Sequence, residues 1–161
     1  MENRNEVTIT FDAYSVNEGF ARMVAAAFAA EFNPTLDEIE DIKTAVSEAV
    51  TNVIIHAYDR EEEKVLVHCW IEDETLWIEV IDHGRGIADV AQAMEPLYTT
   101  RQECDRAGMG FTFMDAFMDT LEVTSAPEKG TTVRMSRHIT RKNVDGPFDY
   151  RDHKLPVAIC R

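Results

Sequence analysis

An acid and an amide one helical turn apart, Glu48 and Asn52, are the residues of this chain best suited to chemistry. Their spacing places both side chains on one face of a helix. The neutral amide oxygen of Asn52 suits Mg²⁺, a hard cation that also takes phosphate oxygens and waters. Glu48 could accept a proton from an attacking hydroxyl or water. The alternative is a surface pair on the polar side of an amphipathic helix, as most Glu and Asn residues are.

Asp82 stands at the end of an alternating strand pattern. The residues that share its face are Leu76, Ile78 and Val80. Since side chains on a strand alternate with a period of two, these apolar residues indicate a buried face. A carboxylate there needs a hydrogen-bond donor, and the exocyclic amine of adenine would serve, with Gly84 and Gly86 leaving space beside it. Taken alone, a glycine turn in which Asp82 accepts from a backbone amide is the favoured interpretation.

Gly108 and Gly110 come at the end of a long connection and open a helix. Free amides at a helix N-terminus attract phosphate, although a lone Gly-x-Gly usually marks only a turn. Arg106 could neutralise charge on a terminal phosphate, and the hydroxyls of Thr99 and Thr100 could bind phosphates. The alternatives are a solvated arginine and threonines that cap a turn.

Hydrophobic periodicity predicts the elements that must position these residues. Strands are expected over 7–11, 64–72, 75–82, 121–125 and 131–137, and helices over 15–32, 35–58 and 110–118. Capping boxes are expected at both long helices, Ser15 with Glu18 and Thr35 with Glu38. Asp73-Glu74 and residues 126–130 read as hairpin turns.

This order of elements predicts an α+β fold. We expect a two-layer sandwich in which a mixed, mostly antiparallel sheet carries its helices on one face. One domain would span residues 1–139. Residues 140–161 lose the periodicity and contain Pro and Gly, which predicts an irregular tail.

The composition narrows the class of protein. The chain has 161 residues, 45% of them hydrophobic, and a formal net charge of −14. Such an acidic domain is a poor candidate for direct nucleic-acid binding, and its charge favours either solubility alone or a basic protein partner. Three cysteines without metal-ligand spacing fit a reducing cytoplasm. We expect neither a signal peptide nor a membrane span.

The order of the motifs resembles an ATP site. The series Glu48-x-x-x-Asn52, Asp82-x-Gly84-x-Gly86, Gly108-x-Gly110 and Gly130-Thr131-Thr132 is similar to the site shared by gyrase B, histidine kinases, the Hsp90 chaperone and MutL, the GHKL superfamily with the Bergerat fold. A closer resemblance, over about residues 7–138, is to the anti-sigma F factors of sporulating bacteria. It rests on residues 17–22, 47–52, 96–100 and 108–112.

The resemblance implies a protein-serine kinase that uses ATP and Mg²⁺ and is also an anti-sigma factor. Such a protein forms a homodimer, binds and inhibits a sporulation sigma factor, and phosphorylates an anti-anti-sigma partner on serine. By position, Glu48 would be the catalytic base, Asn52 the Mg²⁺ ligand and Arg106 a neighbour of the phosphates. Asp82 would read adenine, with Thr131 close by.

The resemblance also implies roles for four glycines and for one ion pair. The residues that would shape the pocket and its lid are Gly84, Gly86, Gly108 and Gly110. Glu18 and Arg22 would lie on the surface used by both protein partners. The alternative for these two is an ordinary helical ion pair worth about 0.3–0.5 kcal/mol.

Three alternatives stay open. The first is a nucleotide-gated sigma-binding module without kinase turnover, against which the presence of Glu48 argues. The second is a general-stress anti-sigma kinase, whose site chemistry would be the same. The third, the ATP-binding domain of a histidine kinase, needs a phosphoacceptor histidine on a preceding helical hairpin. We expect no such hairpin before the first strand.

Overall fold

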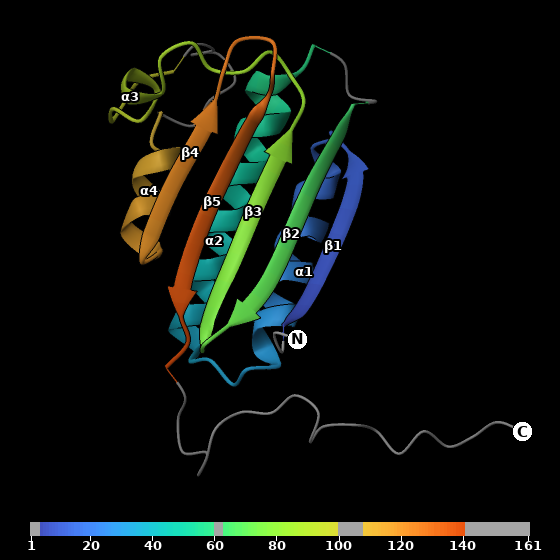
Figure 1. Cartoon of the computed structure of the whole chain (residues 1–161), viewed down its shortest axis with the longest axis vertical. Helices are drawn as coiled ribbons and strands as arrows, with labels where there is room; N and C mark the ends of the chain where they lie inside the picture. Colours follow the sequence, from blue (N-terminus) through green and yellow to red (C-terminus); the bar gives the residue numbers. More distant parts are fainter. Residues whose placement is uncertain (1–3, 60–62, 100–107, 141–161) are drawn as a thin grey trace, which may run out of the picture.

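A five-stranded sheet organises the computed structural model, which describes residues 4–59, 63–99 and 108–140. Its strands are β1 (Asn5–Asp12), β2 (Lys64–Glu72), β3 (Thr75–Asp82), β4 (Thr120–Ser125) and β5 (Thr131–His138). They lie in the order β1-β2-β3-β5-β4 (Figure 1). Every pairing between these strands is antiparallel, so the expectation of a mixed, mostly antiparallel sheet is corrected to a wholly antiparallel one for the described strands.

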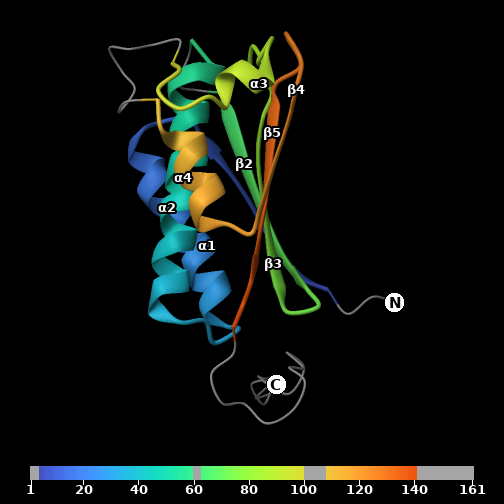
Figure 2. The ribbon, with the colours of Figure 1, turned by 90° about the vertical axis from the view of Figure 1, so that its left-hand side faces the viewer.

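The long helices cover one face of this sheet (Figure 2). The helices are α1 (Val16–Ala30), α2 (Leu36–Asn52), the short α3 (Val90–Ala93) and α4 (Gly110–Phe117), and a π-helical turn, η1 (Val53–Ala57), continues α2. The predicted α+β two-layer sandwich is therefore confirmed. The prediction of an irregular tail falls on residues 140–161, of which only Thr140 is described.

Alternation along the strands builds the core between the two layers. The inward side chains of β3, Leu76, Ile78 and Val80, are fully buried. They meet the apolar stripe of α2, which includes Ile42 and Val46, both also fully buried. Burial of this kind contributes about 25 cal/mol per Å² of apolar surface. The stripe leaves the opposite side of α2 available for polar residues.

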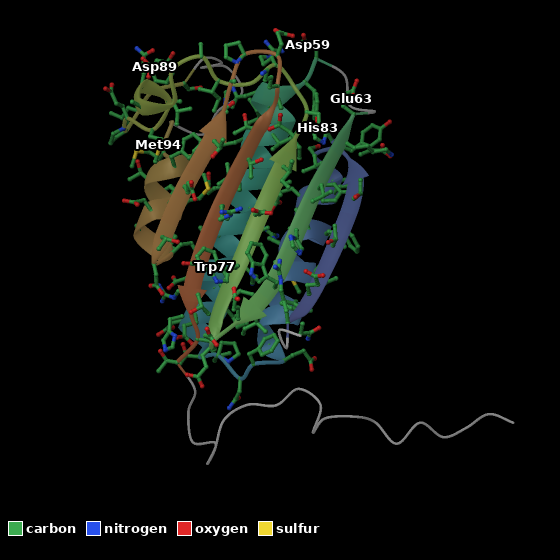
Figure 3. The ribbon with its side chains drawn as sticks, viewed as in Figure 1. Asp59, Glu63, Trp77, His83, Asp89 and Met94 are labelled. Atoms are coloured by element: carbon green, nitrogen blue, oxygen red, sulfur yellow. The ribbon has the colours of Figure 1, made fainter. Side chains whose placement is uncertain are left out.

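The other face of the sheet carries a row of aromatic side chains. Trp70 of β2 stacks on Trp77 of β3 with ring centroids 5.8 Å apart, and Trp77 is labelled on this face in Figure 3. Arg4 lies over the Trp70 ring, 4.4 Å from its centroid.

The two predicted capping boxes have different outcomes. Thr35 accepts from the Glu38 amide at 3.1 Å, and the Glu38 carboxylate accepts from the Thr35 amide at 2.7 Å, so this box is confirmed. The prediction of a capping box at Ser15 is wrong. Ser15 has helical dihedrals (φ −58°, ψ −29°) and makes no side-chain cap bond, because a side chain that caps N2 or N3 requires an extended backbone. Glu18 instead pairs with Arg22 at 3.5 Å.

The β2–β3 hairpin turns on the two residues that the sequence predicts. Asp73 and Glu74 have φ values of 47° and 63°, the left-handed pair of a turn whose twist matches that of the flanking strands. The register follows, with Glu72 opposite Thr75 and Val65 opposite Asp82. Within the described residues, none of the helices has the length and apolar character needed to span a bilayer.

Candidate active site

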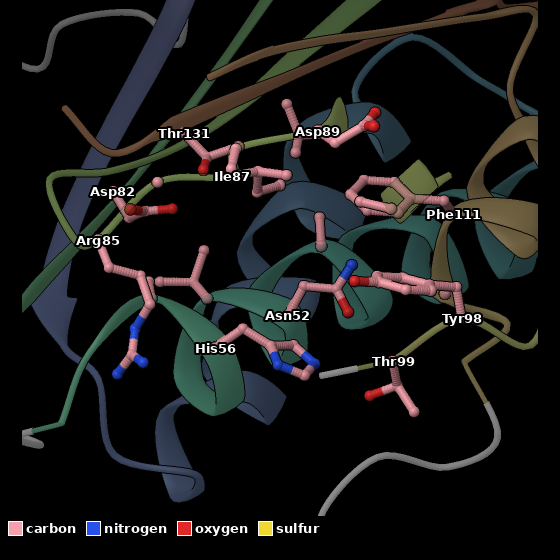
Figure 4. Close-up of a pocket in the computed structure, with 18 of the residues that line it drawn as sticks. Asn52, His56, Asp82, Arg85, Ile87, Asp89, Tyr98, Thr99, Phe111 and Thr131 are labelled. Atoms are coloured by element: carbon pink, nitrogen blue, oxygen red, sulfur yellow. The ribbon is translucent and has the colours of Figure 1, made fainter. Parts of the chain in front are cut away.

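A cavity of about 340 Å³ lies where α2 and η1 approach the end of β3 (Figure 4). Segments far apart in the sequence form its wall. They are α2 with η1, the end of β3 and the turn after it, the connection through α3, the start of α4 and the start of β5. Seven of the residues predicted for the site line it: Asn52, Asp82, Gly86, Thr99, Gly108, Gly110 and Thr131. Tertiary folding therefore brings most of the separate sequence motifs together.

The first turn of α4 lies against the polar side of α2. A Cβ added to Gly110 would be 3.1 Å from Asn52 Oδ1 and 3.1 Å from Glu48 Oε2. Glycine permits this close approach, so the start of the helix, where backbone amides lack intrahelical partners, lies near the acid and the amide. Glu48, half-buried, borders the cavity and is not part of its lining. A neutral oxygen and a helix N-terminus thus line one end of the cavity, with the Glu48 carboxylate just beyond it.

Asp82 forms the wall at another part of the cavity (Figure 4). Its side chain is buried, with 4% relative exposure. Burial raises the pKa of Asp82, while the amides of Gly84 and Thr131 oppose that rise. Oδ1 accepts from the Gly84 amide at 2.8 Å. The turn contact expected from an ordinary glycine turn is therefore present, and the same carboxylate also faces the cavity.

Glycines of the turn after β3 allow backbone segments to meet. A Cβ on Gly84 would overlap the carbonyl of Ala57, and one on Gly86, whose φ is +70°, would overlap the carbonyl of Ala126. Gly86 lines the cavity, whereas Gly84, predicted for the pocket wall, does not. Gly84 instead allows the turn after Asp82 to pack directly against Ala57 of η1.

Several lining residues were missed by the sequence analysis. They include His56, Arg85, Ile87, Tyr98 and Phe111. His56 could have been found, because it continues the four-residue spacing of Glu48 and Asn52, and Figure 4 shows its ring beside the cavity. Ile87 lies in a glycine-rich stretch without a helical or strand period. Phe111 lies in the first turn of α4, which by itself is too short for a period to mark an inward face. The Arg85 guanidinium pairs with the Asp59 carboxylate.

Two predicted site residues lie outside the described part of the chain, and two others lie on a helix away from the cavity. Thr100 and Arg106 fall outside the described residues, as does Cys104. Glu18 and Arg22 form their ion pair on α1, a helix that contributes no lining residue.

Comparison with known proteins defines the class first. The family model described as the histidine kinase-like ATPase domain matches residues 11–137. The fold agrees with the RsbU and RsbW domains of Rv1364c from Mycobacterium tuberculosis (TM-score 0.64, 20% identity, 86% of this chain and 33% of that one). It also agrees with full-length ShkA in complex with AMPPNP (TM-score 0.55, 19% identity, 79% and 31%). The chain spans about one third of each of these two solved proteins.

Curated relatives narrow the class. The chain is 57% identical to the anti-sigma F factor of Caldanaerobacter subterraneus subsp. tengcongensis, over 88% of this chain and 99% of the relative. It is 47% identical to the anti-sigma F factor of Bacillus subtilis strain 168, over 86% and 95%. The chain belongs to the anti-sigma F factor family within the histidine kinase-like ATPases, which confirms the resemblance stated from the motifs.

Proposed function

We propose that this protein is an ATP-dependent protein-serine kinase and anti-sigma factor. It would hold a sporulation sigma factor inactive and phosphorylate an anti-anti-sigma partner on serine. The observation that carries the proposal is the meeting of Gly110, Glu48 and Asn52 beside a cavity that also contains the buried carboxylate of Asp82.

The cavity suits a nucleotide. Its volume of about 340 Å³ falls within the range of roughly 300–1,000 Å³ of small-molecule sites. Asp82 would accept the exocyclic amine of adenine, with Thr131 beside it on β5. Ile87 and Phe111 would offer apolar surface to the base and ribose. Asp82 Oδ1 already holds the Gly84 amide, so the contact with adenine would use its remaining acceptor capacity.

The start of α4 would receive the phosphates. Its free amides and the hydroxyl of Thr99 are donors for them. Within the described residues, no group of three His, Cys, Asp or Glu side chains could hold a metal ion. Mg²⁺ would therefore need ligands from the nucleotide and from water as well as from the protein. Asn52 would bind the ion together with phosphate oxygens and water, the mixture that Mg²⁺ prefers. When bound, Mg²⁺ would neutralise charge on the phosphates.

Glu48 would take the proton in phosphoryl transfer. The serine hydroxyl of the partner attacks the terminal phosphate, its proton passes to the Glu48 carboxylate, and ADP leaves with the electrons of the broken P–O bond. We propose that Arg106 neutralises charge on the terminal phosphate and that the hydroxyl of Thr100 donates to a phosphate oxygen. Both assignments rest on the family motifs alone.

The names of the relatives support sigma binding. Those proteins are anti-sigma F factors, and the net charge of −14 favours a partner with a basic surface. We assign Glu18 and Arg22 to the surface that meets both protein partners. We further propose that the protein acts in the cytoplasm as a homodimer and makes no direct contact with nucleic acid or membrane.

A binding and transfer experiment tests the proposal. Purified protein is mixed with the sigma factor and the anti-anti-sigma protein of the same organism, with ATP labelled on its γ-phosphate and Mg²⁺. We expect retention of the sigma factor only with nucleotide, and transfer of the label to serine. Sigma binding without transfer would favour the nucleotide-gated module. The Asn52→Ala variant should lose Mg²⁺-dependent ATP binding by calorimetry, and unchanged affinity would contradict its assignment.

A further inference from the structure

The turn that follows β3 is held from behind by the end of η1. The Arg85 amide donates to the Ala57 carbonyl at 3.0 Å, and Gly84 packs against that same carbonyl so closely that a Cβ would overlap it. The Asp82 carboxylate accepts from the Gly84 amide at 2.8 Å. The orientation of this carboxylate therefore depends on how η1 supports the backbone of the turn.

Tyr58, the residue after η1, makes the central contact of this support. Its hydroxyl accepts from the His83 amide at 2.8 Å and donates to the Lys64 carbonyl at 2.8 Å. His83 directly follows Asp82 and lies at the end of β3 (Figure 3). One hydroxyl thus joins the end of the helix, the first residue of β2 and the peptide beyond the last residue of β3.

The sheet alone does not supply this contact. The β2–β3 ladder ends with Val65 opposite Asp82, so a side chain binds the next amide. A tyrosine hydroxyl is protonated at neutral pH, and burial raises the pKa of Tyr58 further. The hydroxyl can therefore act as donor and acceptor together. The ladder fixes the backbone of Asp82, and Tyr58 fixes the peptide that sets the direction of the turn.

We infer that Tyr58 is a positioning residue that sets the base preference of the cavity, by fixing the turn through which Asp82 meets the exocyclic amine of adenine. This inference rests on the proposed nucleotide binding. Guanine carries a carbonyl oxygen where adenine carries that amine, so a correctly placed carboxylate favours ATP and disfavours GTP. If the turn after Asp82 were held less firmly, the preference for ATP over GTP would be smaller.

The Tyr58→Phe variant tests the inference, because it removes one oxygen and leaves the ring. Dissociation constants for ATP and GTP are measured by calorimetry with Mg²⁺. We expect ATP to bind roughly two- to tenfold more weakly, as for one net hydrogen bond, while the affinity for GTP is unchanged. A merely structural role would weaken both nucleotides equally, and that result would overturn the inference. Tyr14→Phe, at a tyrosine outside the cavity lining, is the matched control.

A double-mutant cycle with Asp82→Asn tests whether Tyr58 acts through Asp82. In the Asp82→Asn background, Tyr58→Phe should not change the ratio of ATP to GTP affinity further. Additive effects would overturn the inference. If the native chain binds neither nucleotide, the proposed function itself fails. If the native preference for ATP persists in Tyr58→Phe, only the inference fails.

Discussion

The burial of the Asp82 carboxylate lowers the stability of the fold at neutral pH. The amides of Gly84 and Thr131 offset only part of the desolvation that raises the pKa of this carboxylate. A group whose folded pKa is raised stabilises the fold fully below its unfolded pKa. That contribution is lost as pH rises through the folded pKa. At neutral pH the protein without nucleotide is therefore less stable than a variant with a neutral side chain at position 82 would be.

The Asp82→Asn variant should melt at a higher temperature than the native chain at pH 7, in the absence of nucleotide. The amide is neutral and can still accept from the Gly84 amide at its oxygen. The difference should shrink as pH falls toward 3.8, the ordinary carboxyl value, because the native carboxyl is then protonated too. Thermal unfolding followed by circular dichroism measures this. Asp115→Asn, at an exposed aspartate, should show no such pH-dependent gain.

Glu48 provides a second prediction at this scale. Glu48→Gln should lower phosphoryl transfer by about 10²–10⁴-fold, the usual contribution of a general base. Nucleotide affinity should stay nearly unchanged, since the amide keeps the shape of the side chain. Labelled-phosphate transfer and calorimetry separate the two effects. Glu40→Gln, at an exposed residue of the same helix, serves as the control. Normal transfer by the Glu48 variant would show that the proton goes elsewhere.

Two helical elements shape the end of the molecule that holds the cavity. The π-helical turn of η1 continues α2 beyond Asn52, and such turns are frequent at functional sites. It carries His56 to the cavity and brings Ala57 and Tyr58 beneath the turn of Asp82. The other element, α4, contributes only its first turn, and the packing of that turn decides how near its amides come to Glu48 and Asn52.

A methyl group on Gly110 tests the packing of α4. Gly110→Ala places a Cβ at 3.1 Å from both Asn52 and Glu48, so these two side chains must move by a few tenths of an ångström. We expect ATP affinity to fall roughly tenfold, with little change in the melting temperature. Gly19→Ala is the control, since its Cβ meets nothing within 4 Å. That variant should gain about 0.5–1 kcal/mol of stability. Equal ATP affinity in both variants would contradict the role of Gly110.

At the scale of the whole molecule, the net charge of −14 matters for association. Electrostatic steering raises the association rate of oppositely charged proteins and weakens with ionic strength. We expect association with the sigma factor to slow on the order of tenfold between 50 and 500 mM salt. The dissociation rate should change far less. Surface plasmon resonance in the presence of ATP separates the two rates, and a salt-independent association rate would exclude steering.

Short sequence patterns predicted the structure correctly where interactions between neighbouring residues determine it. Alternation along β3 identified its buried face, and Asp73-Glu74 identified the turn. The capping box of Thr35 also formed as predicted. At Ser15 the same signature failed, because the chain enters α1 with a helical backbone that the pattern does not encode. The π-helical turn of η1 was missed for a related reason, since its apolar and polar residues also fit an ordinary helix.

The sequence by itself determined the order of the elements and the residue types of the site, since periodicity, caps and glycines act over a few neighbouring residues. Only the tertiary structure decided that Gly110 lies against Glu48 and Asn52, that Gly84 packs behind the cavity, and that Tyr58 binds the amide after Asp82. These contacts join residues far apart in the chain. Their geometry follows from how the helix layer packs on the sheet, which no local pattern contains.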